Sequence, residues 1–260
     1  MSGWRITPVK KKPFDCGACH NTGYSASGQQ NEMAGMVGTW AEDGVQCEAC
    51  HGPGSQHVNH PMSFGMDIDR DAESCAACHA RGGVDTVGIS DGFISHHDQY
   101  QDLFPGKHAV LDCVQCHDPH AGVVQLRDAR QQTVRTSCED CHFAQAYVQN
   151  NRIHERINVK CVDCHMPRLI KNAVGNAEAF TGDVRTHAVS INPTQISQFT
   201  EDGTAVLPQI SLDFACRGCH SPDGFASVKT DEELLAVASG YHTPLPAVEE
   251  APVEEPAETN

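Results

Sequence analysis

The chain has 260 residues, which is enough for one or two domains. Aromatic residues make up only 6% of it and the mean hydropathy is -0.40, so its side chains alone do not supply an ordinary apolar core. The net charge of -16 argues against nucleic acid or an anionic membrane as partner, and no apolar stretch approaches the length of a transmembrane helix.

The chain starts with a segment, residues 1–13, that is predicted to be an N-terminal arm. Residues Met1 to Asp15 contain no apolar run of the kind that forms the centre of a secretion signal. For an exported protein, this start implies that a leader has been removed or that the chain begins late in its gene.

From residue 16 onward one pattern, Cys-x-x-Cys-His, recurs seven times at irregular intervals. It uses all fourteen cysteines, and none is left over. The spacing fits one helical turn, so a short helix is predicted at each copy. The copies are Cys16/Cys19/His20, Cys47/Cys50/His51, Cys75/Cys78/His79, Cys113/Cys116/His117, Cys138/Cys141/His142, Cys161/Cys164/His165 and Cys216/Cys219/His220.

This pattern is typical of a c-type haem attachment site. Its two thiols reach the two vinyl groups of one haem, and its histidine binds the iron from one side. A structural zinc site needs pairs of cysteine pairs, and a thioredoxin-type motif appears once beside a βαβ unit. A disulfide framework has no use for the histidines. The sequence therefore predicts seven covalently attached haem c groups.

Nine histidines lie outside the motifs, and seven irons each need a sixth ligand. Methionine ligation would raise a haem's potential, but the supply of histidine makes it unnecessary. His60 is set aside because it is redundant with His57. The predicted distal ligands are His57, His96, His97, His108, His120, His154, His187 and His242.

Local sequence suggests where some of these ligands go. His57 follows a tight Gly-Pro-Gly turn that points it toward a neighbouring haem. His96 and His97 point in opposite directions if their segment is extended, so the pair can serve two haems. His120 is too close to His117 to share its haem, and His242 is expected to fold back onto the seventh haem.

Residues 166–215 form the longest stretch without a motif. Alternating polarity, a Glu-Asp-Gly turn signal and β-branched residues predict a small β-hairpin within 185–214, or else a pair of extended arms. Elsewhere we expect low regular secondary structure, mainly short α-helices and loops wrapped around a stacked haem core. We expect residues 14–242 to form one heptahaem domain whose polypeptide does not fold without its haems.

A helix is predicted from Asp231 to Gly240. Thr230 is its N-cap, Glu233 completes a capping box, and Gly240 ends it. Residues 243–260 combine four prolines with five glutamates, which predicts an acidic disordered tail.

Four segments together resemble multihaem c-type cytochromes of the electron-transfer kind. They are residues 16–24 (CGACHNTGY), 38–55, 96–120, and 161–167 together with 180–187. The resemblance implies bis-histidine haems stacked into a wire, and filament-forming extracellular cytochromes look similar around the first two motifs.

The leading hypothesis is an electron-transfer protein of the periplasm or the cell exterior, without enzymatic activity, whose partners are redox proteins or extracellular acceptors. A nitrite, hydroxylamine or sulfur-oxyanion reductase is an alternative, although the supply of histidines and the lack of a Cys-x-x-Cys-Lys variant argue against it. A third hypothesis is a subunit of a homo-oligomeric conducting filament.

Overall fold

The computed structural model describes residues 12–67, 69–81, 87–95, 99–121, 134–147 and 152–243. His96, His97 and nearly all of the predicted arm and tail lie outside these ranges. As predicted, the described chain consists of short helices and loops with very little sheet. The helices are α1 (Gly17–His20), η1 (Gln30–Glu32), α2 (Cys47–His51), α3 (Ser55–Asn59), α4 (Ala72–His79), α5 (Gln99–Leu103), α6 (Cys113–Cys116), η2 (Cys138–Asp140), α8 (Phe143–Tyr147), α9 (Arg152–Arg156), α10 (Cys161–His165), η3 (Asp213–Arg217), α11 (Gly218–His220) and α12 (Asp231–Ala238).

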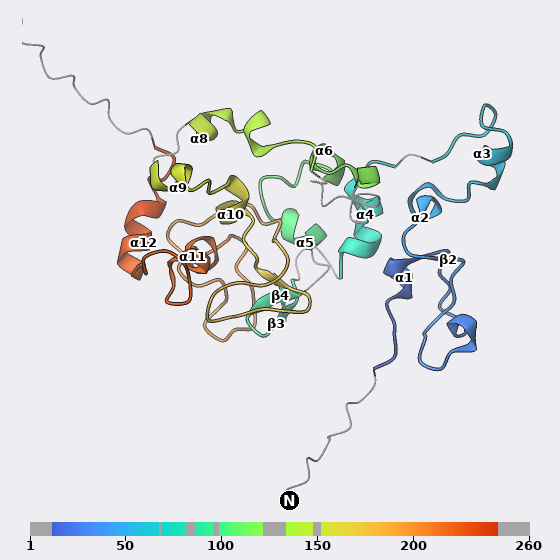
Figure 1. The fold of residues 1–260 in the computed structure, drawn as a ribbon, viewed down its shortest axis with the longest axis horizontal. Coiled ribbons are helices and arrows are strands. Elements are labelled where there is room, and N and C mark those ends of the chain that lie inside the picture. The colour runs from blue at the N-terminus through green and yellow to red at the C-terminus, as the bar shows by residue number, and fades with distance from the viewer. Residues whose placement is uncertain are drawn as a thin grey trace, which may run out of the picture.

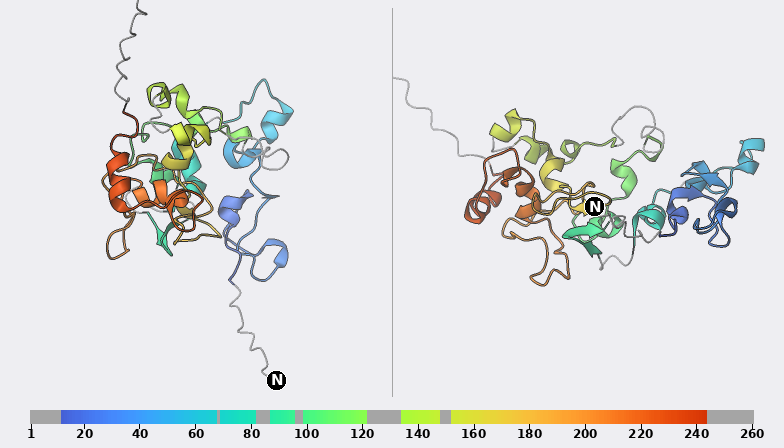
Figure 2. Two further views of the ribbon diagram at one scale, coloured as in Figure 1. Left: turned by 60° about the vertical axis from the view of Figure 1, so that its left-hand side comes forward. Right: turned by 60° about the horizontal axis from the view of Figure 1, so that its bottom comes forward.

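Residues 12–67 form a lobe that stands out from the rest of the molecule, as both Figure 1 and Figure 2 show. The lobe carries the first two motifs, on α1 and α2. Helix α1 meets α4 of the main body, where the Cys19 thiol lies 3.9 Å from the Ala77 carbonyl oxygen. The third motif therefore sits where the lobe joins the body.

Side chains bonded to the backbone hold the N-terminal lobe together. Its sheet is only β1 (Asn21–Thr22) paired antiparallel with β2 (Glu42–Asp43). The Gln30 side chain bonds both backbone groups of Trp40, at 3.0 and 3.2 Å. Among the residues of the lobe that the structure describes, no large apolar side chain is fully buried. Packing within the polypeptide therefore contributes little apolar burial to this lobe.

The main body contains a three-stranded sheet of order β3-β4-β5. Strands β3 (Ile89–Ser90) and β4 (Phe93–Ser95) form a hairpin, and β5 (Ile170–Lys171) adds in parallel to β4. The hairpin turn is Asp91-Gly92, with positive φ at both residues (52° and 78°), as a two-residue type I′ turn requires. Lys171 bonds the Asp91 carboxylate at 2.8 Å, which ties β5 to the turn.

The compact apolar core lies against this sheet. Phe93 and Ile94 of β4 and Ile170 of β5 pack on Phe214, with the Phe93 and Phe214 rings edge to face at 6.1 Å. The rest of the cluster is Leu169, Ala188, Ile210 and Ala215. Most attachment motifs lie away from this cluster, so it anchors one side of the body only.

In place of the hairpin predicted within 185–214, the structure has two isolated bridges, an antiparallel one between Phe199 and Val206 and a parallel one between Ile191 and Ile210. The Gln198 side chain explains the difference. Its amide donates to two backbone carbonyls at 2.9 Å, and its oxygen accepts from the Ser211 amide at 2.8 Å. These bonds satisfy backbone groups that a strand ladder would otherwise pair.

Helix α12 begins where the sequence predicts. The Thr230 side chain accepts from the Glu233 amide at 3.3 Å, and the Glu233 carboxylate accepts from the Thr230 amide at 2.9 Å, which completes the capping box. The helix ends at Ala238, two residues before Gly240. Tyr241 and His242 follow in a turn.

Asp183 fastens the loop that follows β5. Its carboxylate accepts from the backbone amides of Asn172, Ala173 and Val174 at 2.7 to 2.9 Å. These bonds stabilise the ionised form and lower the pKa of Asp183 to about 2. Because this value lies below that of an unfolded aspartate, the ionised carboxylate stabilises the folded state above about pH 4.

We predict that Asp183→Asn destabilises the haem-loaded protein at pH 7, and that the difference from wild type vanishes as the pH falls from about 4 to about 2. Thermal unfolding at several pH values measures this. Asp223→Asn is the control, because its carboxylate is exposed and has no hydrogen bond within the described chain. A deficit that persists unchanged at pH 2 would contradict the prediction.

We also predict that the polypeptide made without haem has no cooperative thermal transition. The apolar core is confined to one side of the body, and the N-terminal lobe buries no large apolar residue in its described part. Circular dichroism of the haem-free chain measures this, with the haem-loaded chain as reference. A sharp melt of the haem-free chain would show that the polypeptide packs by itself.

Candidate haem sites

The attachment motifs form single backbone turns, as their spacing predicts. In the first, fourth and fifth motifs, the amide of the histidine donates to the carbonyl of the first cysteine at 2.8 to 3.0 Å. The turn puts both thiols and the imidazole on neighbouring sides of one short segment. Arg185 caps the sixth motif, since its guanidinium bonds the carbonyls of Val162 and Met166 at 2.5 and 2.8 Å and the Asp163 carboxylate at 2.8 Å.

Two motifs have a short helix that is not of the α type: Cys216 of the seventh lies on the π-helical turn η3, and the fifth lies on a 3₁₀ turn. Its helix, η2, is a 3₁₀ turn that ends at Asp140, so Cys141 lies just beyond it and is exposed. The Asp140 carboxylate accepts from the Ser137 amide at 2.8 Å, and the Cys141 amide donates to the Cys138 carbonyl at 3.3 Å. This bond to the third residue back closes the tighter 3₁₀ turn, which rarely runs further. The fifth motif therefore lies on a short helix of the 3₁₀ type, and haem attachment through Cys141 stays a prediction.

All fourteen cysteines lie in the described ranges, and none forms a disulfide. Burial raises the pKa of Cys164 to about 12 and that of Cys216 to about 11, with the neighbouring thiols adding to the effect. These values apply before attachment, since a thioether sulfur has no proton to lose. The causes of these shifts show that Cys164 of the sixth motif lies close to Cys216 and Cys219 of the seventh.

Five motif histidines face a second histidine across a gap. The ring centres lie 5.8 to 6.1 Å apart in every pair, although the partners come from distant parts of the chain. The pairs are His51 with His120, His117 with His187, His142 with His108, His165 with His242 and His220 with His154.

This separation fits two imidazoles on opposite sides of one metal ion. A histidine nitrogen binds a metal at about 2 Å, so two rings bound in line have centres on the order of 6 Å apart. Rings in direct stacking contact can come closer than this. The spacing therefore leaves room for an iron between the two rings, and the donor set fits bis-histidine haem.

The outer ring nitrogens of several histidines are anchored. Nδ1 of His51, His165 and His220 lies 2.5 to 2.8 Å from a backbone carbonyl oxygen, those of Asp67, Val189 and Ser227 respectively. Nδ1 of His154 lies 2.8 Å from the Tyr241 hydroxyl. A proton held on Nδ1 leaves Nε2 free to bind a metal, which is the usual arrangement of a ligating histidine.

Burial keeps several of these imidazoles neutral. It lowers the pKa of His187 to about 4, and the nearby His117 and His79 add to the effect. Burial also lowers the pKa values of His108, His117, His154 and His165. The neutral imidazole is the form that binds a metal.

The remaining predicted ligands are placed differently. The two motif histidines outside the five pairs are His20 and His79, and Nδ1 of His79 lies 3.4 Å from the Gln99 side-chain oxygen. His57 donates from Nδ1 to the Phe64 carbonyl at 2.7 Å, but it faces no motif histidine in the described part of the chain. His96 and His97 lie outside the described residues, so their ligation stays a prediction.

Two expectations about individual ligands can be compared with the structure. His242 pairs with His165 of the sixth motif rather than with the seventh, because the turn after α12 carries it toward α10. His120 faces a motif other than its own, as expected. The sequence did not point to Tyr241 or Asp102 as supports for ligands. Tyr241 directly precedes the predicted ligand His242, and this is the one local signal that could have indicated its role.

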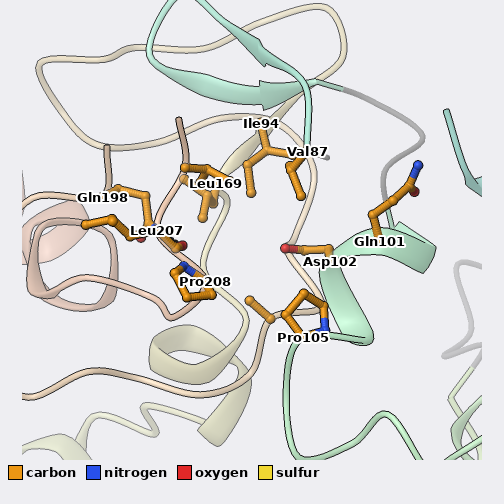
Figure 3. Close-up of a pocket in the computed structure, with 11 residues that line it drawn as sticks. Val87, Ile94, Gln101, Asp102, Pro105, Leu169, Gln198, Leu207 and Pro208 are labelled. Atoms are coloured by element: carbon orange, nitrogen blue, oxygen red, sulfur yellow. Dashed lines mark hydrogen bonds between the residues drawn. The ribbon is translucent and has the colours of Figure 1, made fainter. Parts of the chain in front are cut away.

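Asp102 lies at a small cavity beneath the core sheet. The cavity measures about 20 Å³, room for about one water molecule, and Figure 3 shows the Asp102 carboxylate directed into it between Val87 and Pro208. A larger open space of about 270 Å³ lies beside Cys161, with Glu139 and Lys160 in its lining. The smaller cavity is too small to hold a substrate. The larger one is lined by Cys161, a thiol of the sixth attachment motif.

The structure adds two findings about metal ions and membranes. No group of three or more His, Cys, Asp or Glu side chains is placed to hold a metal ion directly within the described ranges. In the same ranges, no helix combines the length and the apolar character needed to cross a lipid bilayer.

Comparison with known proteins identifies relatives. The family model "Cytochrome c554 and c-prime" matches residues 5–52, which hold the first two motifs. The multihaem cytochrome MtrA of Shewanella baltica (strain OS185) is 30% identical over 210 residues. This match covers 71% of the chain and 58% of MtrA, so the chain spans a little over half the length of that relative.

Two solved structures show weaker likeness. The outer cell wall cytochrome OcwA matches with a TM-score of 0.42 at 20% identity, over 68% of this chain and 56% of its own. The undecahaem cytochrome from the S-layer of Carboxydothermus ferrireducens matches with a TM-score of 0.34 at 19% identity, over 60% and 37%. The attachment motifs and the sequence matches agree, and the chain is a multihaem c-type cytochrome.

Proposed function

We propose that the chain holds seven haem c groups, one at each motif, within a single domain of residues 14–242, and that it conducts electrons among them in the periplasm or outside the cell. Its partners are redox proteins or extracellular acceptors. When bound, haem supplies an iron that gains and loses one electron. The observation that carries the proposal is the set of five imidazole pairs.

In these pairs the polypeptide supplies an imidazole on both sides of the metal position. Two ligands that are held by the fold leave no vacant position for a substrate, which favours electron transfer over catalysis. The Nδ1 anchors on Asp67, Val189 and Ser227 fix ring orientation and increase the basicity of the ligand. Basic axial ligands favour low reduction potentials.

Attachment points of different motifs lie close together, which supports conduction between them. The Cys161 thiol of the sixth motif lies 3.7 Å from the carboxylate of Glu139, a residue inside the fifth motif. The Cys19 thiol lies beside Ala77 of the third motif, and α10 packs against η3, which carries Cys216. Groups attached at such neighbouring points are held at short separation.

Low-temperature EPR of the oxidised protein tests the proposal. We expect only low-spin signals, with no change on addition of nitrite or cyanide. Mass spectrometry of the intact protein should give a mass that exceeds the polypeptide by seven haem groups. A high-spin signal that responds to either ligand would instead support the reductase alternative, with His79 as the first site to examine.

The distal ligand His187 depends on a buried carboxylate. Asp102 accepts hydrogen bonds from the Thr186 hydroxyl and, at 2.5 Å, from the backbone amide of His187. Thr186 and Asp102 are 0% and 5% exposed, so bulk water does not reach these hydrogen bonds. The carboxylate therefore fixes the backbone that presents His187 to His117.

We predict that Asp102→Ala destabilises the haem-loaded protein by about 2 to 4 kcal/mol, because two buried donors lose their acceptor. It should also alter one low-spin EPR signal, because His187 is no longer held in place. Denaturant unfolding and EPR measure the two effects. Asp183→Asn is the matched control, since that carboxylate also holds backbone amides but none beside a ligand. An unchanged EPR spectrum in Asp102→Ala would show that Asp102 does not position a ligand.

A further inference from the structure

Tyr241 occupies a position between two of the imidazole pairs. Its ring centre lies 5.9 Å from that of His154, which faces the seventh motif. It lies 5.1 Å from that of His242, which faces the sixth motif. One half-buried side chain therefore contacts the distal histidines of two sites.

The Tyr241 hydroxyl makes a specific hydrogen bond. An imidazole that binds a metal through Nε2 keeps its proton on Nδ1, so His154 Nδ1 donates and the Tyr241 oxygen accepts, at 2.8 Å. Nδ1 of two other distal histidines, His108 and His187, is buried and has no hydrogen-bond partner in the described part of the chain. The phenol thus distinguishes the His154 site from these two.

The Tyr241 ring acts on the second site through packing. It meets the His242 ring edge to face at 80°, a favourable aromatic geometry that restricts how His242 can turn. The backbone holds this arrangement, because the Tyr241 amide donates to the Ala238 carbonyl and the Thr243 amide to that of Gly240. Helix α12 therefore delivers Tyr241 and His242 as one unit.

We propose that Tyr241 is a positioning residue shared by the sixth and seventh haem sites, with its hydroxyl setting the ligand strength of His154 and its ring fixing the orientation of His242. This inference rests on the proposed ligation of iron by His154 and His242. A group that accepts a hydrogen bond from Nδ1–H makes the imidazole a stronger donor to the metal, which favours the oxidised state and lowers the reduction potential.

Tyr241→Phe removes the hydroxyl and keeps the ring. In a redox titration followed by visible absorbance, we expect one component to shift to a higher potential and one low-spin EPR signal to change its g values, with the haem mass unchanged. Tyr241→Leu removes the ring as well, so a second component should also change. Tyr100→Phe is the control, because that hydroxyl bonds the Glu73 carboxylate at 3.3 Å instead of a histidine. This control should titrate like wild type.

The outcomes separate this inference from the proposed function. His154→Ala should convert one low-spin signal to high spin, and if it does not, the ligand assignment fails and Tyr241 loses its role with it. If His154→Ala gives the high-spin signal but Tyr241→Phe titrates like wild type, the inference alone is wrong. Shifts spread over many components in Tyr241→Phe would also overturn it, since the hydroxyl contacts one imidazole.

Discussion

The gap of about 6 Å between facing imidazoles is the constraint on which the rest of the structure depends. Each pair joins a motif turn to a segment far away in the sequence, so the loops between them must close at fixed points. The polypeptide meets this requirement with little sheet and with no described helix longer than eight residues. Side chains such as Gln30, Gln198 and Asp183 fasten the loops by bonding backbone groups directly.

The low apolar content of the chain agrees with this organisation. Residues that pack densely with one another gather at β4, β5 and η3, while the N-terminal lobe buries no large apolar residue within its described part. A domain of this length normally depends on a continuous apolar core. We propose that haem groups would fill the space between the motif turns, with the motif cysteines and the facing histidines holding them.

Local features of this fold are predictable from sequence, and long-range ones are not. The motif turns and the capping box at Thr230 follow from short spacings, although the turn at Cys141 is tighter than an α-helix. The Asp91-Gly92 turn carries an equally local signal, because an Asp-Gly pair favours a two-residue hairpin turn. By contrast, the pairing of His242 with His165 depends on where α12 docks, and the role of Asp102 depends on a contact across 85 residues of chain. Near Phe199, the Gln198 side chain bonds a backbone carbonyl that the expected strand ladder would have paired. Strand propensity does not account for such side-chain bonds to the backbone.

The direction in which each pair runs along the chain has a consequence for biosynthesis. His51, His117 and His165 precede their partners, whereas His142 and His220 follow theirs. Because the chain is made from its N-terminus onward, the partner histidines of the fifth and seventh motifs are made before the motifs themselves. The second, fourth and sixth must wait for residues still to be made. If these pairs ligate haem as proposed, a haem attached at one of those three motifs before its partner is made would lack its second histidine until the chain is complete.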